Sequence, residues 1–452
     1  MPPLDAETIA TFGRRLRARE VTSSAVVEEC LRRIDAVNPR LNAFILVMAD
    51  EARGAALQAD RELAAGIDRG PLHGAPISIK DLIDVRGRPT TAASRVRDGH
   101  VAEHDAPAVA QLRRAGAVII GKTNLHEFAF GVTNEDSAFG PARHPDDPTR
   151  SPGGSSGGSA VSVAAGMAIA TLGTDTGGSI RIPAAACGLV GLKPTYGEVS
   201  TDGVVPLSRG LDHVGPLAHT VADAWLVYRS LLASGAPQPM PPLTHTAMTG
   251  LRLGVPRDYF CDLLDEEVRG QFEQGLDRLR RAGARIEAVE IPHARDVAPI
   301  YLTLVLADAA AYHATTLDAV PERYTPPVRM RLEMGRYVLA EDYVRAQKGR
   351  ELLRNEVDAA LVEQDALALP TLPIPAPLLG AASVTLGDRE EPTRNLMLRL
   401  TQLFNLTGHP ALSMPCGRTA AGLPCGLQLV GARMQTDRLT RTALACERYL
   451  RD

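Results

Sequence analysis

Two short clusters of glycine and serine contain the residues of this chain best suited to covalent chemistry. They occupy residues 152–159 and 173–181, and the apolar stretch 160–172 separates them. A flexible linker has a similar composition but not this order, in which glycines flank single serines. Glycine lets the backbone approach a ligand and turn its N–H groups toward one point, where they can stabilise an oxyanion. A serine held there can attack a carbonyl carbon, so the two clusters predict an enzyme.

A lysine and an aspartate follow the apolar segment 75–79, which has the composition of an internal strand. Strand alternation would point Lys80 and Asp81 in opposite directions, so the lysine could be buried away from that carboxylate. Burial lowers the pKa of a lysine from about 10.4 by up to several units, and a neutral lysine is a competent general base. The alternative is a surface lysine at a strand end, and this residue alone does not decide between them.

Residues 116–123 match the phosphate-loop pattern G-x-x-x-x-G-K-[ST] letter for letter. The residues between its glycines are Ala-Val-Ile-Ile, and such β-branched residues favour a strand over a loop that wraps around phosphate. We therefore expect a buried strand that ends in a turn, and no ATP site.

Residues 153–157 match G-x-S-x-G, the nucleophile elbow of α/β-hydrolases. That elbow follows a strand, whereas residues 145–152 have the composition of a loop. The downstream histidines also lie in no distinctive setting, so a Ser-His-Asp hydrolase is disfavoured.

The composition limits the class of protein. The chain has 452 residues, 45% of them hydrophobic, with mixed charges and a formal net charge of −4. Positive charge is not clustered as it would be in a nucleic-acid-binding protein. No signal peptide is visible, and no apolar run approaches the roughly 20 residues of a membrane span. The six cysteines are scattered and indicate reduced thiols, not a disulfide framework or a zinc site. A soluble cytoplasmic enzyme with no membrane or nucleic-acid partner is expected.

The periodicity of apolar residues predicts alternating helices and strands, which is typical of an α/β fold with a mixed, largely parallel central sheet surrounded by helices. Four prolines within 237–242 predict a loop. The helices are expected at 23–36, ended by Asn38-Pro39, and at 49–66, 105–115, 221–232 and from 265 onward. The strands are expected at 75–79, 117–120, 284–291 and 365–369.

Lys80 and the two serine clusters together resemble the amidase signature family, serine hydrolases that cleave C–N bonds with a Ser–Ser–Lys triad. The likeness is strong over 72–221 and weaker at 405–411 and 422–431. Its central segments are 73–81, 121–128, the two serine clusters and 187–197. The resemblance implies that Ser179 is the nucleophile, that Ser155 bridges on a cis peptide bond with Gly154, and that Lys80 is the terminal base.

The resemblance also implies roles for the residues around this triad. It places the oxyanion hole at four backbone N–H groups, those of Thr176, Gly177, Gly178 and Ser179. Asp175 and Arg181 are expected to orient the nucleophile loop, with an ordinary loop ion pair as the alternative. The acyl pocket is expected along Phe128, Phe130 and Gly131, with core packing as the alternative for the two phenylalanines.

Water would hydrolyse the acyl-enzyme, so no metal or cofactor is expected. The resemblance implies an N-terminal helical segment, residues 1–70, packed on a catalytic domain of residues 71–452 with a variable substrate-pocket region at about 235–400. Relatives are often dimers, which makes a homodimer the implied assembly. Three tyrosines and two methionines within 300–340 are expected to form an apolar pocket, with helix packing as the alternative: Tyr301, Tyr312, Tyr324, Met330 and Met334.

The motifs define the bond better than the substrate, and three enzymatic interpretations stay open. The first is an amidase for small or aryl amides that extends to esters and carbamates (urethanes). The second is the glutaminase subunit of a tRNA-dependent amidotransferase, although the chain is somewhat short and no glutamine-binding pattern is recognised in its C-terminal half. The third is an allophanate- or biuret-type hydrolase, whose members tend to differ at Thr176-Gly177-Gly178. An inactive structural paralogue is the non-enzymatic alternative.

Overall fold

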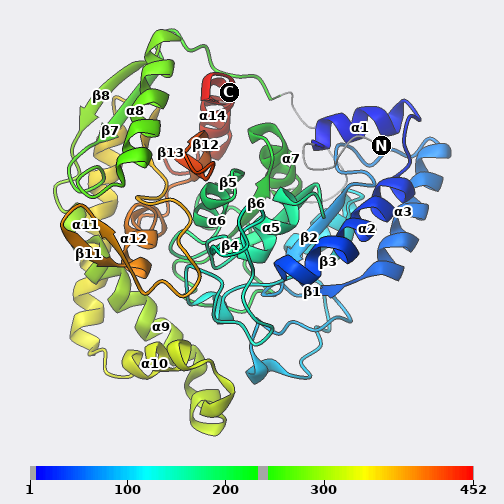
Figure 1. The fold of residues 1–452 in the computed structure, drawn as a ribbon, viewed down its shortest axis with the longest axis horizontal. Helices are drawn as coiled ribbons and strands as arrows, with labels where there is room; N and C mark the ends of the chain where they lie inside the picture. Colours follow the sequence, from blue (N-terminus) through cyan, green and yellow to red (C-terminus); the bar gives the residue numbers. More distant parts are fainter. Residues whose placement is uncertain (1–6, 233–242, 451–452) are drawn as a thin grey trace.

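A computed structural model describes residues 7–232 and 243–450 and places an eleven-stranded sheet at the centre of the molecule (Figure 1). In chain order its strands are β1 (Phe44–Val47), β2 (Pro76–Lys80), β3 (Val118–Thr123), β4 (Ala170–Asp175), β5 (Val190–Lys193), β6 (His213–Ala218), β7 (Arg252–Pro256), β8 (Arg285–Val289), β9 (Ala366–Pro370), β12 (Ala411–Arg418) and β13 (Pro424–Val430). The spatial order is β1-β3-β2-β4-β6-β5-β12-β13-β9-β7-β8. A separate hairpin joins β10 (Ser383–Leu386) to β11 (Arg389–Pro392).

The sheet is mixed, which confirms the predicted fold class. β2 pairs in parallel with both β3 and β4, and β7 pairs in parallel with β8 and β9. Between these two groups the pairing is antiparallel, as in β4 with β6 and β12 with β13. Because β2 and β4 are parallel, their carboxyl ends, Lys80 and Asp175, lie at the same edge of the sheet.

Helices cover the sheet and extend beyond it (Figure 1). α1–α3 lie at one end of the molecule, whereas α9–α11 project together at the other end. The helices are α1 (Ile9–Arg17), α2 (Ser23–Leu41), α3 (Ala49–Ala64), α4 (Pro107–Arg114), α5 (Gly157–Ala164), α6 (Arg181–Ala186), α7 (Val221–Leu232), α8 (Glu266–Arg281), α9 (Val297–Ala319), α10 (Pro326–Gly335), α11 (Ala340–Leu361), α12 (Thr393–Arg399), α13 (Leu403–Leu406) and α14 (Thr436–Leu450).

The predicted helices and strands are present, and most of their ends lie within two residues of the expected ones; the larger differences are β3, which continues to Thr123, and α2. α2 does not end at Asn38-Pro39 but continues to Leu41, and Asn42 caps it in the left-handed conformation with φ of 53°. Pro39 is tolerated because it lies exposed in the last turn, where the carbonyl that loses its donor can face water. The apolar stretch 160–172 is divided between α5 and β4. The proline-rich loop predicted at 237–242 lies outside the described residues.

The N-terminal segment contributes a strand as well as helices. β1 pairs antiparallel with β3 and forms one edge of the sheet, between α2 and α3 in the chain. Its four residues are Phe-Ile-Leu-Val, a run too short for its period to indicate a strand.

One helical stretch in the described chain, 294–319, is long and apolar enough to cross a membrane by length and composition. It contains α9, which packs against α10 and α11 and buries Tyr301, Leu304 and Val305 within the protein. In the apolar window of this stretch, 44% is buried within the protein.

Candidate active site

Lys80, the last residue of β2, has a fully buried side chain. Its Nζ donates hydrogen bonds of 2.7 Å to Ser155 Oγ and of 2.7 Å to Thr174 Oγ1. Burial lowers the pKa of Lys80 to about 7, although the charges of Asp175 and Asp212 oppose the shift. A large fraction of this amine is therefore neutral near pH 7, as a general base requires.

Asp81 points the opposite way, as strand alternation predicts. Its Oδ1 lies 2.8 Å from Lys122 Nζ, and its other oxygen accepts from Thr91. Lys122 is buried within β3, and the residues that matched a phosphate loop form that strand. The interpretation of 116–123 as a buried strand is confirmed, and no ATP site is formed there.

Ser155 lies in the loop that leads into α5, and no strand precedes it. The expected cis peptide bond between Gly154 and Ser155 is present. A Cβ added to Gly154 would lie 2.8 Å from the backbone nitrogen of Asn134, so the neighbouring loop leaves room for glycine alone. The elbow of an α/β-hydrolase is therefore absent at this serine.

Ser179 lies in the loop between β4 and α6, and its residue is 5% exposed. The Ser156 N–H donates a 3.3 Å hydrogen bond to the Ser179 carbonyl, so the two serine clusters adjoin. The structure thus brings Lys80, Ser155 and the nucleophile loop together at the carboxyl ends of β2 and β4.

The two glycines before Ser179 are required by close packing. Gly178 has φ of +139°, and a Cβ there would lie 2.2 Å from Thr401 Oγ1. That hydroxyl donates a 2.6 Å hydrogen bond to the Gly177 carbonyl. A Cβ on Gly177 would lie 2.4 Å from the Tyr301 hydroxyl oxygen. We call residues 176–179 the oxyanion loop; α9 and the segment after α12 cover it.

Asp175 and Arg181 form a buried bidentate ion pair across this loop. Arg181 Nε and Nη2 each lie 3.0 Å from a carboxylate oxygen of Asp175. Burial alone would raise the pKa of Asp175, but the Arg181 guanidinium holds it well below its usual range. Asp175 also accepts from the Ile180 N–H at 3.1 Å and from Asn405 Nδ2 at 2.8 Å. The pair therefore anchors both ends of the turn that carries Ser179.

Asp212 and Thr174 were not found from the sequence. Asp212 accepts a 2.6 Å hydrogen bond from Thr176 Oγ1, and burial raises its pKa to about 6. It reaches the oxyanion loop because Asp175 of β4 is paired with His213 of β6. No local pattern marks Asp212, since its position depends on a strand pairing between distant segments.

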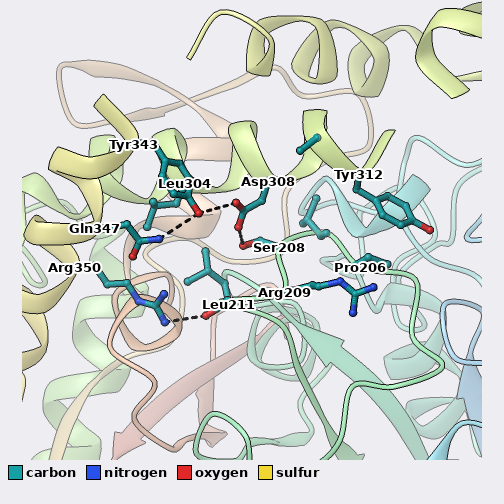
Figure 2. A pocket seen from close by; sticks show the side chains of 13 residues that line it. Pro206, Ser208, Arg209, Leu211, Leu304, Asp308, Tyr312, Tyr343, Gln347 and Arg350 are labelled. Carbon is teal, nitrogen blue, oxygen red and sulfur yellow. Dashed lines mark hydrogen bonds between the residues drawn. The ribbon is translucent and has the colours of Figure 1, made fainter. Parts of the chain in front are cut away.

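The loop 206–211, just before Asp212, is tied to α9 and α11 around a cavity of about 380 Å³ (Figure 2). Ser208 Oγ donates a 2.5 Å hydrogen bond to Asp308 of α9, and the Tyr343 hydroxyl of α11 donates one of 2.9 Å to the same carboxylate. These contacts connect the outer helices to the backbone that holds Asp212.

Phe128 and Phe130 are buried against different partners. The Phe128 ring lies edge-on to His313 of α9, with 4.3 Å between the ring centroids, and 5.6 Å from the Tyr324 ring. The Arg331 guanidinium lies over Phe130 at 5.7 Å and donates to its carbonyl.

Gly131 is also closely packed, because a Cβ there would lie 2.0 Å from His126 Nε2. All three residues of the predicted acyl pocket are therefore closely packed, and their contact with a substrate stays a prediction.

The five aromatic and methionine residues expected to share an apolar pocket do not form one, although Tyr324 and Met330 line the same cavity of about 280 Å³. Tyr301 lies at the oxyanion loop, whereas Tyr312 lines the cavity of Figure 2 and is 43% exposed. Met330 and Met334 are exposed on α10 at 58% and 50%. They are separated because residues 320–325 reverse the chain between α9 and α10, which turns their outer faces to solvent.

The described chain offers no metal site. Among residues 7–232 and 243–450, no group of three His, Cys, Asp or Glu side chains could hold an ion. The six cysteines are free and buried.

Comparison with known proteins gives one consistent relationship. The amidase family model matches residues 25–440. The A subunit of the glutamyl-tRNA(Gln) amidotransferase of Anaeromyxobacter sp. (strain K) is 42% identical, covering 97% of this chain and 95% of that protein. An amidase of Pseudomonas putida is 40% identical over 99% of this chain and 97% of its own. A crystal structure of an amidase superposes with a TM-score of 0.92 at 40% identity, over 98% of this chain and 100% of that one.

Proposed function

The chain belongs to the amidase family, and from this premise we propose that it hydrolyses the C–N bond of small or aryl amides through an acyl-enzyme on Ser179. The observation that carries the proposal is the contact between a buried lysine of lowered pKa and the Ser155 hydroxyl. Only a neutral amine can accept a proton from that hydroxyl, and burial is what makes the amine neutral.

In the proposed first step, Ser179 attacks the carbonyl carbon while its proton passes to Ser155 and the proton of Ser155 passes to Lys80. In the neutral amine, Lys80 would keep one N–H on Thr174 Oγ1 and turn its lone pair toward Ser155, so that across the same 2.7 Å contact the Ser155 hydroxyl donates and Nζ accepts. Thr174 is thus a positioning residue. The relay then runs backward and protonates the leaving nitrogen, without which an amine departs poorly.

The negative charge that develops on the carbonyl oxygen would be stabilised by the N–H groups of the oxyanion loop, residues 176–179. A single donor of this kind contributes about 2.7–4 kcal/mol to the transition state. Water then hydrolyses the acyl-enzyme and returns Ser179.

The Pseudomonas putida relative and the solved structure, each named an amidase, support an amide as the substrate. The same acyl transfer would extend to esters and to carbamates. The reduced state of six buried cysteines supports a cytoplasmic location.

A second candidate is the glutaminase subunit of an amidotransferase, in complex with other subunits. It is favoured by the 42% identity to the amidotransferase relative, and the 95% coverage of that relative removes the argument that the chain is too short. The allophanate- or biuret-type reaction has less support because Thr176, Gly177 and Gly178 all fit the amidase pattern. An inactive paralogue is disfavoured by the Lys80–Ser155 contact.

The test is a comparison of purified protein on 4-nitroacetanilide, a nitrophenyl carbamate, glutamine and biuret, with Ser179→Ala as the control. We expect turnover of the anilide and the carbamate that the variant lacks. If glutamine is the one compound cleaved, the glutaminase function replaces the proposal. If biuret is the one cleaved, the urea-type function does.

A further inference from the structure

A cavity of about 550 Å³ borders the oxyanion loop on the side covered by α9 and α12. Tyr301 and Leu398 line it and also contact that loop. A Cβ on Gly177 would lie 2.4 Å from the Tyr301 hydroxyl oxygen and 3.1 Å from Leu398 Cδ2. The cavity and the loop that carries Ser179 therefore share Tyr301 and Leu398 as neighbours.

The charge in this cavity is mainly positive. Its lining carries Arg295, Arg394 and Arg399 but one carboxylate, that of Glu391. Arg295 lies at the exposed rim and forms an ion pair of 3.0 Å with Asp262. Arg394 and Arg399, both on α12, form no ion pair with any carboxylate in the described chain.

Both α12 guanidiniums also have unused hydrogen-bonding capacity. The Nε atoms of Arg394 and Arg399 are buried without an acceptor among residues 7–232 and 243–450. Arg399 is held in place, since its Nη2 donates to the Tyr259 carbonyl at 2.7 Å and its Cζ lies 3.8 Å from the Tyr259 ring centroid. Buried donors in proteins are nearly always paired with protein, water or ligand, so both Nε–H groups are free to bind an acceptor that enters the cavity.

The pKa shifts of the arginines in this region also favour a bound anion. Burial lowers the pKa of Arg394 and of Arg399, which means that neither cation is fully compensated. The charge of Arg394 adds to burial in lowering the pKa of Arg331 to about 10. An anion between these groups would offset their burial and their repulsion.

We propose that this cavity binds a carboxylate of the substrate, so that the amides cleaved best carry an anionic group a short distance from the scissile bond. The inference rests on the proposed amidase function and specifies its substrate class. A guanidinium presents a planar fork that matches a carboxylate, which makes Arg394 the main partner and Arg399 the second. Glutamine and the monoamides of dicarboxylic acids both belong to this class.

The test compares charged and neutral substrates that share the reacting bond. For a carboxylate on the acyl side, succinyl-4-nitroanilide is compared with butyryl-4-nitroanilide. For one on the amine side, 4-acetamidobenzoate is compared with 4-methylacetanilide. We expect the charged member to have the higher kcat/KM in one of these pairs. Arg394→Gln should lower that value about ten- to hundredfold, mainly through KM, and leave the neutral member within about threefold.

Arg295→Gln is the matched control, because it removes the same charge at the rim of the cavity, where solvent screens it. We expect kcat/KM of the charged substrate to change less than about threefold in this variant. An equal loss for charged and neutral substrates in Arg394→Gln would overturn the proposal, as would an equal loss in Arg295→Gln or no preference for charge in either pair. If the neutral anilide is cleaved in a Ser179-dependent way without such a preference, the amidase function stands and the carboxylate site does not.

A binding measurement keeps the carboxylate site testable if no amide is cleaved. Succinate should raise the Tm of the wild-type protein and of Arg295→Gln but not that of Arg394→Gln. No rise with the wild type, or an equal rise in Arg394→Gln, would contradict the site without reference to turnover.

Discussion

At the scale of single residues, the proposed chemistry depends on whether Lys80 can act as a base. The amine has hydroxyls as neighbours, those of Ser155 and Thr174, and the carboxylates of Asp175 and Asp212 act on it from beyond hydrogen-bond distance. Burial therefore outweighs the attraction of these charges and brings the pKa to about 7. A carboxylate in direct contact would instead have kept the lysine charged.

Removing each member of the triad should reduce turnover to a different extent. Ser179→Ala should abolish turnover, Lys80→Ala should nearly do so, and Ser155→Ala should leave a small residual activity. Water can take over the proton transfer of Ser155 inefficiently, but it cannot replace the nucleophile. Steady-state kcat on 4-nitroacetanilide checks the series. Wild-type rates in Lys80→Ala or Ser179→Ala would contradict the triad.

The rate should depend on pH through the same lysine. Below about pH 7 the Lys80 amine is protonated and cannot accept a proton, so kcat/KM should rise through that pH and level off on the alkaline side. The measurement is a kcat/KM profile from about pH 5.5 to 9.5. A profile that is flat between about pH 6 and 9 would exclude lysine as the base.

Asp212→Asn gives a sharper test of the electrostatic balance. The carboxylate of Asp212 raises the pKa of Lys80, so its removal should move the acid limb of the profile to lower pH. Asparagine can still accept the hydrogen bond of Thr176 through Oδ1, but its Nδ2 would lose the bond that the Leu207 N–H now donates to Asp212 Oδ2. A loss of rate at every pH with no movement of the limb would mean that Asp212 acts through the loop alone.

At the scale of elements, the site is an edge of a sheet with two glycine-rich loops attached. The parallel pairing of β2 with β4 aligns Lys80 with the start of the nucleophile loop. The Asp175–Arg181 pair then fastens that loop to the segment around Thr401 and Asn405. Removing one partner of a buried ion pair like this typically costs about 3–5 kcal/mol, because the other charge is left uncompensated.

Gly178→Ala tests the packing of the oxyanion loop. The added Cβ would meet Thr401 Oγ1, and φ of +139° disfavours any side chain. We expect kcat to fall at least about 100-fold, the cost of a displaced oxyanion donor. Gly422→Ala is the control, since Gly422 also has positive φ (+78°) but no atom within 4 Å of the added Cβ. Similar kcat losses in both variants would show that the clash with Thr401 has no role.

The sequence predicted the parts of this site that lie within continuous motifs. Lys80, the Ser155 loop and the Ser179 loop are each surrounded by characteristic neighbours, and the β-branched run of 118–120 identified β3 correctly. Thr174, Asp212 and Arg394 could not be predicted, because their roles depend on which distant strands and helices become neighbours. Asp212 reaches Thr176 through the β4–β6 pairing, and Arg394 lines a cavity that also contains Tyr301 and Leu398, two side chains that lie against the oxyanion loop.

At the scale of the whole molecule, one edge of the sheet holds the proposed catalytic residues. The outer helices supply the side chains that face this edge. Tyr301 of α9 and Leu398 of α12 contact the oxyanion loop, and Ser208 joins α9 and α11 to the loop that precedes Asp212. Substrate selection would therefore depend on residues 295–402, which lie outside the motifs that form the triad. The family relationship identifies the bond that is cleaved more directly than the molecule that contains it.

The decisive experiment is to find which side chain carries the acyl group. The protein is incubated with a nitrophenyl carbamate, whose carbamoyl-enzyme is hydrolysed slowly, and is then digested and analysed by mass spectrometry. We expect one carbamoyl adduct, on Ser179, that is absent from Ser179→Ala and forms more slowly in Lys80→Ala. An adduct on Ser155, or nitrophenol release that persists in Ser179→Ala, would contradict the assignment of Ser179 as the nucleophile.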